Sequence, residues 1–182
     1  NSVIQNLDKP SYTVIDIDPS EQNTFEQVIA VALAVKEVLE LAKIKGYPKT
    51  SGSSGIHIYI PLNGKYSYDE ARNFTKLLCY YVRERLPKLA TMERSLKKRG
   101  DKIYLDYLQN RRGQTLASPY FVRPKKGAPV SAPLLWEEVK PDLRISDFTI
   151  KNMASRLKKV GDLFVPVLGD CIDMEAAIDH LS

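Results

Sequence analysis

The sequence contains only two cysteines among its 182 residues, and no stretch approaches the roughly 20 consecutive apolar residues that span a bilayer. Cys79 and Cys171 lie far apart and lack metal-ligand spacing, so neither a disulfide framework nor a zinc site is indicated. The N-terminus also lacks the charged and then apolar pattern of a secretory signal. These absences favour a protein of the reducing cytoplasm without a membrane partner.

The sequence also lacks internal repeats and low-complexity segments. Its hydrophobic share of 43% is typical of globular proteins, and 182 residues suffice to bury a core of ordinary size. We therefore predict a single domain over residues 1–182.

The segment 12–20 carries two carboxylates, Asp16 and Asp18, within a short apolar run. In a strand, residues two apart project from the same face, so both carboxylates point one way while Ile15 and Ile17 point into a core. Pro19 ends the strand, which places the pair where a loop opens to solvent. The alternative is an edge strand with two solvated acids.

The order of the remaining elements predicts the fold class. Apolar residues at helical spacing, each preceded by a capping box, predict long helices over 24–43 and 66–86. The order indicates an α/β (α+β) domain with a mostly antiparallel sheet flanked by helices. The other expected strands are 56–60 and 102–108, with a hairpin partner over 114–122 followed by an irregular stretch over 124–141. Short helices are expected within 90–102, over 152–160 and over 173–181. An extended segment over 163–168 joins the last two helices.

Asp106 lies among apolar neighbours in the expected strand 102–108, where an unpaired carboxylate is costly. A divalent metal shared with Asp16 and Asp18 would compensate it, because Mg²⁺ and Mn²⁺ prefer carboxylate oxygens and accept further ligands from phosphates. Three such acids could hold two metals for in-line phosphoryl transfer. Spacing alone leaves open that the acids are instead paired with basic residues, namely Arg94, Arg99 or Lys102.

The segment 50–57 combines two glycines with several hydroxyl side chains and leads into a strand. Its backbone N–H groups and hydroxyls are suited to cradle phosphate oxygens. It is not a Walker loop, because the Gly-Lys-Ser/Thr ending is absent and a strand follows. His57, at the start of that strand, is either a structural residue or a contact to a triphosphate.

Basic residues concentrate between positions 97 and 126, close to Tyr104, Tyr107 and Tyr120. Clustered positive charge with nearby aromatic rings is typical of proteins that bind a nucleic-acid backbone. A solvated basic face is the alternative. The candidate nucleic-acid contacts are Lys97, Lys98, Arg99, Arg111 and Arg112.

Three motifs in this order resemble those of the polymerase domain of bacterial ligase D, a member of the archaeo-eukaryotic primase superfamily that acts in non-homologous end joining. They are Asp16-Ile-Asp18-Pro, Ser51-Gly-Ser-Ser-Gly-Ile-His57, and a segment over 102–124 that contains Asp106. The resemblance runs from about Tyr12 to the C-terminus. It implies a primase-type palm.

The resemblance also implies the activity and the site. The activity is metal-dependent, template-directed addition of nucleotides, with a preference for ribonucleotides, at DNA ends. Asp16, Asp18 and Asp106 are the implied catalytic triad, with Mn²⁺ or Mg²⁺ as cofactor and a nucleoside triphosphate as substrate. Implied partners are gapped or overhanging DNA, ligase and nuclease domains of a parent chain, and the end-binding protein Ku. The implied nucleotide-binding residues are Ser51, Ser54, His57, Gln109 and Arg123.

The sequence departs from the family pattern in two places. Many relatives carry lysine where Ser54 stands, so positive charge at the triphosphate must come from elsewhere, with Arg123 and Lys49 as candidates. Only 15 residues precede Asp16, where the family has a sizeable segment, so we expect the C-terminal larger part of such a domain.

Two other functions are alternatives to the polymerase hypothesis. One is a catalytically inactive fragment that binds DNA ends. The other is acid/base hydrolysis of the glycosidase type, which is weaker because those carboxyl groups flank a bond from opposite sides.

Overall fold

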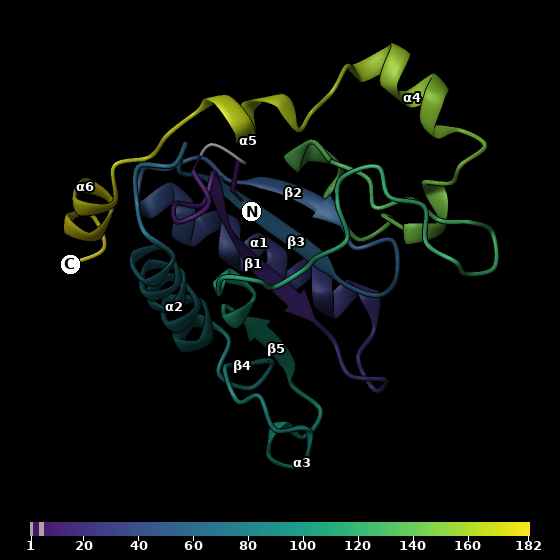
Figure 1. The fold of residues 1–182 in the computed structure, drawn as a ribbon. Coiled ribbons are helices and arrows are strands. Elements are labelled where there is room, and N and C mark those ends of the chain that lie inside the picture. The colour runs from purple at the N-terminus through teal and green to yellow at the C-terminus, as the bar shows by residue number, and fades with distance from the viewer. Residues whose placement is uncertain (1, 4–5) are drawn as a thin grey trace.

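The computed structural model describes residues 2, 3 and 6–182, and its centre is a five-stranded sheet (Figure 1). The strand order is β2-β3-β1-β5-β4. All neighbouring pairs are antiparallel except β4 and β5, which are parallel. The mixed fold with a mostly antiparallel sheet is thereby confirmed. The strands are β1 (Tyr12–Asp18), β2 (Tyr47–Thr50), β3 (Ile56–Pro61), β4 (Ala90–Thr91) and β5 (Ile103–Asp106).

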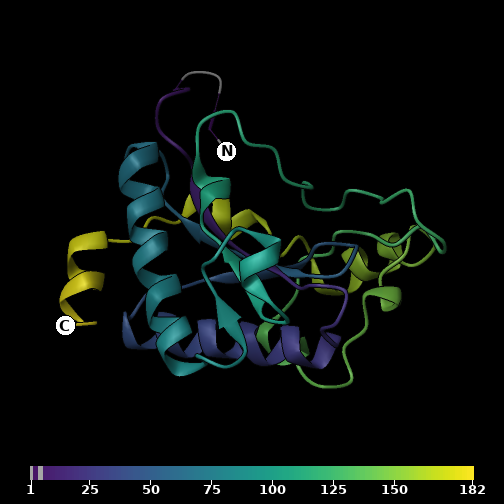
Figure 2. The ribbon, with the colours of Figure 1, turned by 90° about the horizontal axis from the view of Figure 1, so that it is seen from below.

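Two long helices, α1 (Phe25–Leu41) and α2 (Tyr68–Arg85), pack against one face of this sheet (Figures 1 and 2). Both begin with the expected capping boxes, at Thr24 and Ser67, which satisfy N–H groups of the first turn. Ile15 and Ile17 of β1 are fully buried in the core beneath these helices, as the alternation predicted. This arrangement leaves the side chains of Asp16 and Asp18 on the opposite face.

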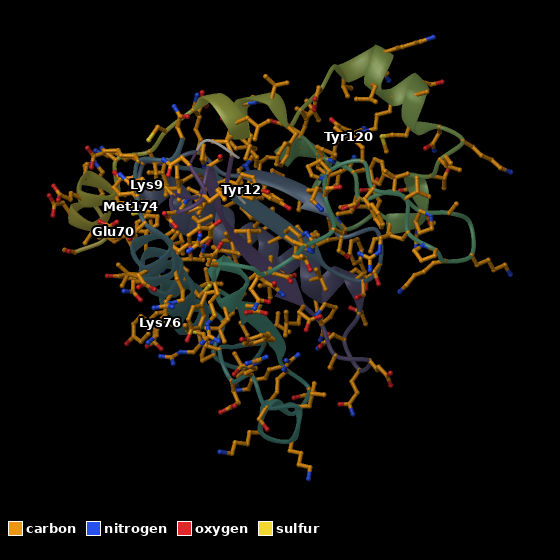
Figure 3. The ribbon with its side chains drawn as sticks, viewed as in Figure 1. Lys9, Tyr12, Glu70, Lys76, Tyr120 and Met174 are labelled. Atoms are coloured by element: carbon orange, nitrogen blue, oxygen red, sulfur yellow. The ribbon has the colours of Figure 1, made fainter. Side chains whose placement is uncertain are left out.

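A smaller apolar cluster covers part of that opposite face. Val14 and Tyr59 from the sheet pack against Phe164 and Val167 near the C-terminus. Tyr12 and Tyr120, labelled in Figure 3, are partly buried against this cluster. The cluster closes one end of the face, and the carboxylates lie further along β1.

The remaining helices are short. They are α3 (Leu96–Arg99), α4 (Met153–Val160), α5 (Val165–Gly169) and α6 (Met174–Asp179), together with the 3₁₀ turns η1 (Leu108–Asn110), η2 (Trp136–Glu138) and η3 (Ile145–Asp147). The expected helices within 90–102, 152–160 and 173–181 are confirmed. None of the described helices combines the length and apolar character needed to cross a membrane.

Two expectations are wrong, and one alternative is excluded. Residues 114–122 do not form a hairpin partner, because β5 ends at Asp106, whose carboxylate accepts the Leu108 N–H and starts the turn η1. Residues 165–169 are helical rather than extended, since Pro166 lies in the first turn, where its missing N–H costs nothing. The alternative of an edge strand also fails, because β1 lies between β3 and β5 in the sheet.

Candidate active site

The sheet register brings Asp16, Asp18 and Asp106 to one face. Asp16 of β1 is directly opposite Asp106 of β5 on one side and His57 of β3 on the other. Opposed residues of antiparallel strands project from the same face, and Asp18 is two residues along the same strand. Three carboxylates therefore share the face that α1 and α2 leave free.

Of the two carboxylates on β1, Asp16 is more buried than Asp18. Its side chain is 15% exposed, whereas that of Asp18 is 51% exposed. Burial raises the pKa of Asp16 to about 7, and the negative charges of Asp18 and Asp106 add to this, while Lys49 opposes it. A cation placed among these carboxylates would relieve both the desolvation and the repulsion.

The donor chemistry of the three carboxylates fits Mg²⁺ or Mn²⁺, but their present rotamers are directed elsewhere. Asp106 Oδ1 accepts from Leu108 N at 2.8 Å and from the Tyr104 hydroxyl at 3.2 Å, and Asp18 Oδ2 lies 3.4 Å from Arg99 Nη1. Within the described ranges, no three His, Cys, Asp or Glu side chains are grouped closely enough to hold a metal ion. Metal binding would require the carboxylates to come closer together than they are here.

A polar cavity of about 290 Å³ opens beside Asp16. Residues 115–117, which were not among the predicted site residues, also line this cavity. The predicted site residue Gln109 does not line the cavity. Its side-chain oxygen is buried in η1 without a hydrogen-bond partner. The candidate residues that line the cavity are Asp16, Asp18, Ser51, Ser54, His57 and Arg123.

The loop between β2 and β3 is organised around Ser51. Its hydroxyl oxygen accepts the backbone N–H groups of Ser53, Ser54 and Gly55 at 3.0 to 3.1 Å. The expectation of free backbone donors in this loop is thereby corrected, because these three N–H groups already have an acceptor. Side-chain hydroxyls remain as the loop's groups for a ligand.

Both loop glycines are needed for close approach. A Cβ on Gly55 would lie 2.2 Å from the Ile17 carbonyl oxygen, which leaves no room for a side chain against β1. Gly52 has φ +68, and a Cβ there would come within 2.8 Å of Arg123 Cγ. Arg123 in turn donates to the Ser51 carbonyl at 3.1 Å, so a distant segment holds the loop against the cavity.

His57 is buried between a carboxylate and a lysine. Its Nε2 lies 3.4 Å from Asp16 Oδ1, and its Nδ1 lies 3.1 Å from Lys49 Nζ. Burial lowers the pKa of His57 well below its usual value, and the positive charges of Lys49 and Arg123 add to the effect. Lys49 is fully buried behind His57 and does not line the cavity. Recognition of the short strand β2 would have found this contact, because β2 pairs Lys49 with His57.

The candidate nucleic-acid contacts fall into two groups. Lys97 and Lys98 on α3 and Arg111 and Arg112 after η1 are exposed. Arg99 is 6% exposed, pairs with Asp18 and lies with its guanidinium 4.5 Å from the Tyr104 ring centre. An ion pair between one of the acids and a nearby basic residue was the alternative to a metal site, and Arg99 makes such a pair with Asp18.

Comparison with known proteins places this arrangement in a family. Residues 1–164 match the family described as LigD, primase-polymerase domain. The chain belongs to this family. The resemblance deduced from the three motifs is thereby confirmed.

Relatives and a solved structure agree with this assignment. The LigD domain described here is 41% identical over 154 residues to the bifunctional non-homologous end joining protein LigD of Bacillus subtilis, covering 84% of this chain and 25% of that protein. It is 33% identical over 158 residues to the multifunctional LigD of Mycolicibacterium smegmatis, covering 86% of this chain and 20% of that protein. The chain thus spans a quarter or less of these relatives' lengths.

The fold matches that of the polymerase domain from Mycobacterium tuberculosis ligase D in complex with DNA. The TM-score is 0.81 at 30% identity, covering 90% of this chain and 57% of that chain. The fold predicted from the resemblance is confirmed by this match.

Proposed function

We propose that this LigD domain is a metal-dependent, template-directed nucleotidyltransferase that adds nucleotides at broken DNA ends during non-homologous end joining. The observation that carries the proposal is the sheet face shared by Asp16, Asp18 and Asp106, next to a polar cavity. Asp16, Asp18, His57 and Arg123 line this cavity, and Asp106 does not. The names of the relatives support the end-joining context.

The proposed chemistry divides between the carboxylates and the cavity. Asp16, Asp18 and Asp106 would hold Mn²⁺ or Mg²⁺, which supplies Lewis acidity and charge neutralisation for in-line phosphoryl transfer. Arg123 and the hydroxyls of Ser51 and Ser54 would bind the triphosphate. The cavity of about 290 Å³ holds only part of a nucleotide, so the remainder would extend toward solvent.

The proposed partners follow from the exposed basic residues and from the comparisons. The side chains of Lys97, Lys98, Arg111 and Arg112 would contact the phosphates of gapped or overhanging DNA. A relative of the same fold was solved with DNA. We also propose ligase and nuclease domains of a parent chain and Ku as partners.

Primer extension tests the activity. The substrate is a labelled gapped duplex with Mn²⁺ and nucleoside triphosphates, and the variants are Asp16→Ala and Asp106→Ala, with Asp142→Ala on an exposed loop as the control. We expect extension by the wild type and the control and none by the two site variants. Metal-assisted nucleotide binding that calorimetry finds equal in wild type and Asp16→Ala would falsify the mechanism.

A catalytically inactive domain that binds DNA ends is the second candidate. It is favoured by the contact of Arg99 with Asp18 and by the two hydrogen bonds of Asp106, which already engage these carboxylates with groups of the protein. This candidate binds gapped DNA with a steep salt dependence and gives no extension at any Mn²⁺ concentration. The same extension assay therefore separates the two functions.

A further inference from the structure

Lys49 is a fully buried lysine next to the proposed nucleotide site. It lies on β2, opposite His57 in the register. A buried ammonium group is costly unless all its hydrogens are bonded. The contacts of Lys49 Nζ are His57 Nδ1 at 3.1 Å, the Ala117 carbonyl at 3.1 Å, the Thr50 carbonyl at 3.3 Å and the Ser131 hydroxyl.

Counting donors and acceptors among these contacts assigns the proton on His57. Burial lowers the pKa of Lys49 to about 7, an effect that the Asp16 carboxylate opposes and Arg123 adds to, so the count applies to the ammonium form present below pH 7. An ammonium group has three hydrogens and accepts nothing. The Ser131 hydroxyl donates its own hydrogen to the Thr50 carbonyl at 3.0 Å, so it is an acceptor toward Lys49. The three ammonium hydrogens are shared among four acceptors, with the Thr50 carbonyl the most distant at 3.3 Å. In none of these arrangements can the ammonium group accept a hydrogen from His57. Nδ1 is therefore the acceptor, and the imidazole hydrogen is on Nε2.

The orientation of His57 matters for what it can bind. Nε2 is the ring atom nearest the site, 3.4 Å from Asp16 Oδ1. With hydrogen on Nε2, the ring presents a donor to oxygen anions, whether from Asp16 or from a phosphate. The other tautomer would present a lone pair that repels them.

We infer that Lys49 is a positioning residue that holds His57 in the Nε2–H tautomer and ties the cavity wall at Ala117 to β2. The tautomer assignment stands on the contacts of Lys49 alone. Its effect on nucleotide binding rests on the proposed function.

The tautomer can be measured directly, because the sequence contains only two histidines. Two-bond ¹H–¹⁵N correlation spectra of ¹⁵N-labelled protein distinguish the two neutral tautomers, and a His180→Gln variant assigns the signals. The spectra are recorded slightly below pH 7, where Lys49 is mainly an ammonium group and the lowered pKa of His57 keeps the ring neutral. We expect the Nε2–H pattern for wild-type His57. An Nδ1–H pattern overturns the inference even if every variant fails to fold.

The Lys49→Met variant tests the cause. Methionine keeps the approximate volume and removes the donors, so we expect His57 to lose its single-tautomer pattern. Lys88→Met, at an exposed lysine, is the matched control and should leave the pattern unchanged. A folded Lys49→Met protein that retains the wild-type His57 pattern contradicts the role assigned to Lys49.

Nucleotide binding separates this inference from the function on which its importance depends. We expect calorimetry with Mn²⁺ to show nucleotide affinity reduced roughly tenfold in Lys49→Met, by analogy with the low end of the effect that outer-shell partners of metal-binding histidines have, and unchanged in Lys88→Met. If the wild type binds no nucleotide while the tautomer results hold, the proposed function fails and the placement of Lys49 stands. If the wild type binds nucleotide and Lys49→Met binds equally well, the positioning role fails.

Discussion

Asp16 is surrounded by groups that make its ionisation unfavourable. It is 15% exposed, and two further carboxylates share its sheet face. His57 and Lys49 lie on its other side, and Lys49 partly offsets the repulsion. An ionised carboxylate in such a position destabilises the folded state unless a cation binds next to it. Metal binding should therefore increase the free energy of unfolding.

The contribution of Asp16 to the stability of the metal-free protein should therefore decrease as the pH rises, whereas the lowered pKa values of His57 and Lys49 act in the opposite direction, so the effect is measured against Asp16→Asn. The pKa of Asp16 is raised from 3.8 to about 7 in the folded state, so the folded state binds the extra proton. That contribution is fully present below about pH 4 and is lost as the pH rises through about 7. Urea unfolding at pH 5 and pH 8 should show a loss in the wild type that is about 2–4 kcal/mol larger than in Asp16→Asn, at roughly 1.4 kcal/mol per pKa unit.

The effect of added metal on the urea midpoint is the second part of this test. Mn²⁺ at pH 8 should raise the urea midpoint of the wild type and leave that of Asp16→Asn almost unchanged, because only the wild type carries the full carboxylate set. Asp142→Asn, on an exposed loop, is the control and should follow the wild type. Equal pH dependence in wild type and Asp16→Asn would contradict the assignment of the raised pKa to Asp16.

At the scale of elements, the sheet face that carries the candidate active site is held together by contacts between short segments. The loop after β2 rests on β1 through Gly55, and α3 reaches β1 through the pair of Arg99 and Asp18. These contacts join pieces that are each too short to be stable alone.

Gly55→Ala tests the contact between the loop and β1. The new Cβ would lie 2.2 Å from a backbone oxygen of the central strand, which cannot move without disturbing its ladder. We expect a loss of about 1–3 kcal/mol in the free energy of unfolding, typical of overpacking. Gly169→Ala is the matched control, since its Cβ meets nothing within 4 Å. Similar unfolding curves for the two variants would show that the close approach is not maintained in solution.

Arg99→Met tests whether α3 competes for the metal. The guanidinium lies 3.4 Å from Asp18 Oδ2, so a divalent ion must share or displace this cation. Removing the positive charge should strengthen Mn²⁺ binding several-fold in calorimetry, because two cations repel at one carboxylate. Lys98→Met, an exposed neighbour on α3, should change metal affinity little. Weaker Mn²⁺ binding in Arg99→Met than in Lys98→Met would mean that Arg99 positions Asp18 instead of competing for it.

At the scale of the whole molecule, positive charge is distributed unevenly. Lys97 and Lys98 lie on α3, while Lys158 and Lys159 lie on α4, and Figure 1 places these two helices at opposite ends of the protein. If DNA binds along the active-site face near α3, the two pairs should contribute differently to affinity.

Replacing Lys97 and Lys98 by alanine should weaken binding to gapped DNA and reduce its salt dependence. Each lost phosphate contact lowers the slope of log K against log salt by about 0.9. We expect the magnitude of this slope to be smaller by about 1–2 than in the wild type, as measured by fluorescence anisotropy titrations at several salt concentrations. The matched double variant at Lys158 and Lys159 should keep the wild-type slope. If the α4 variant loses slope and the α3 variant does not, DNA binds near the other end.

Local sequence patterns predicted the long helices well. The predictions failed for segments whose structure depends on tertiary contacts. The helices α1 and α2 carry their own capping boxes and apolar spacing, so they were found from sequence. The strand β2 was missed because Pro48 is typical of a turn, yet proline is tolerated in this strand at the sheet's end. The hairpin over 114–122 was predicted from residue types alone, whereas β5 pairs with β1, which is distant in sequence.

That Asp16 and Asp18 share a strand face follows from local sequence, because the two-residue period of a strand is a local property. The family was likewise predicted from three sequence motifs, and the match over residues 1–164 confirms it. In contrast, three contacts emerge from the assembled fold: Asp106 lies opposite Asp16, Arg99 pairs with Asp18, and Lys49 is buried behind His57. Those contacts depend on register between distant strands and on burial of charge, and both are set when the sheet assembles.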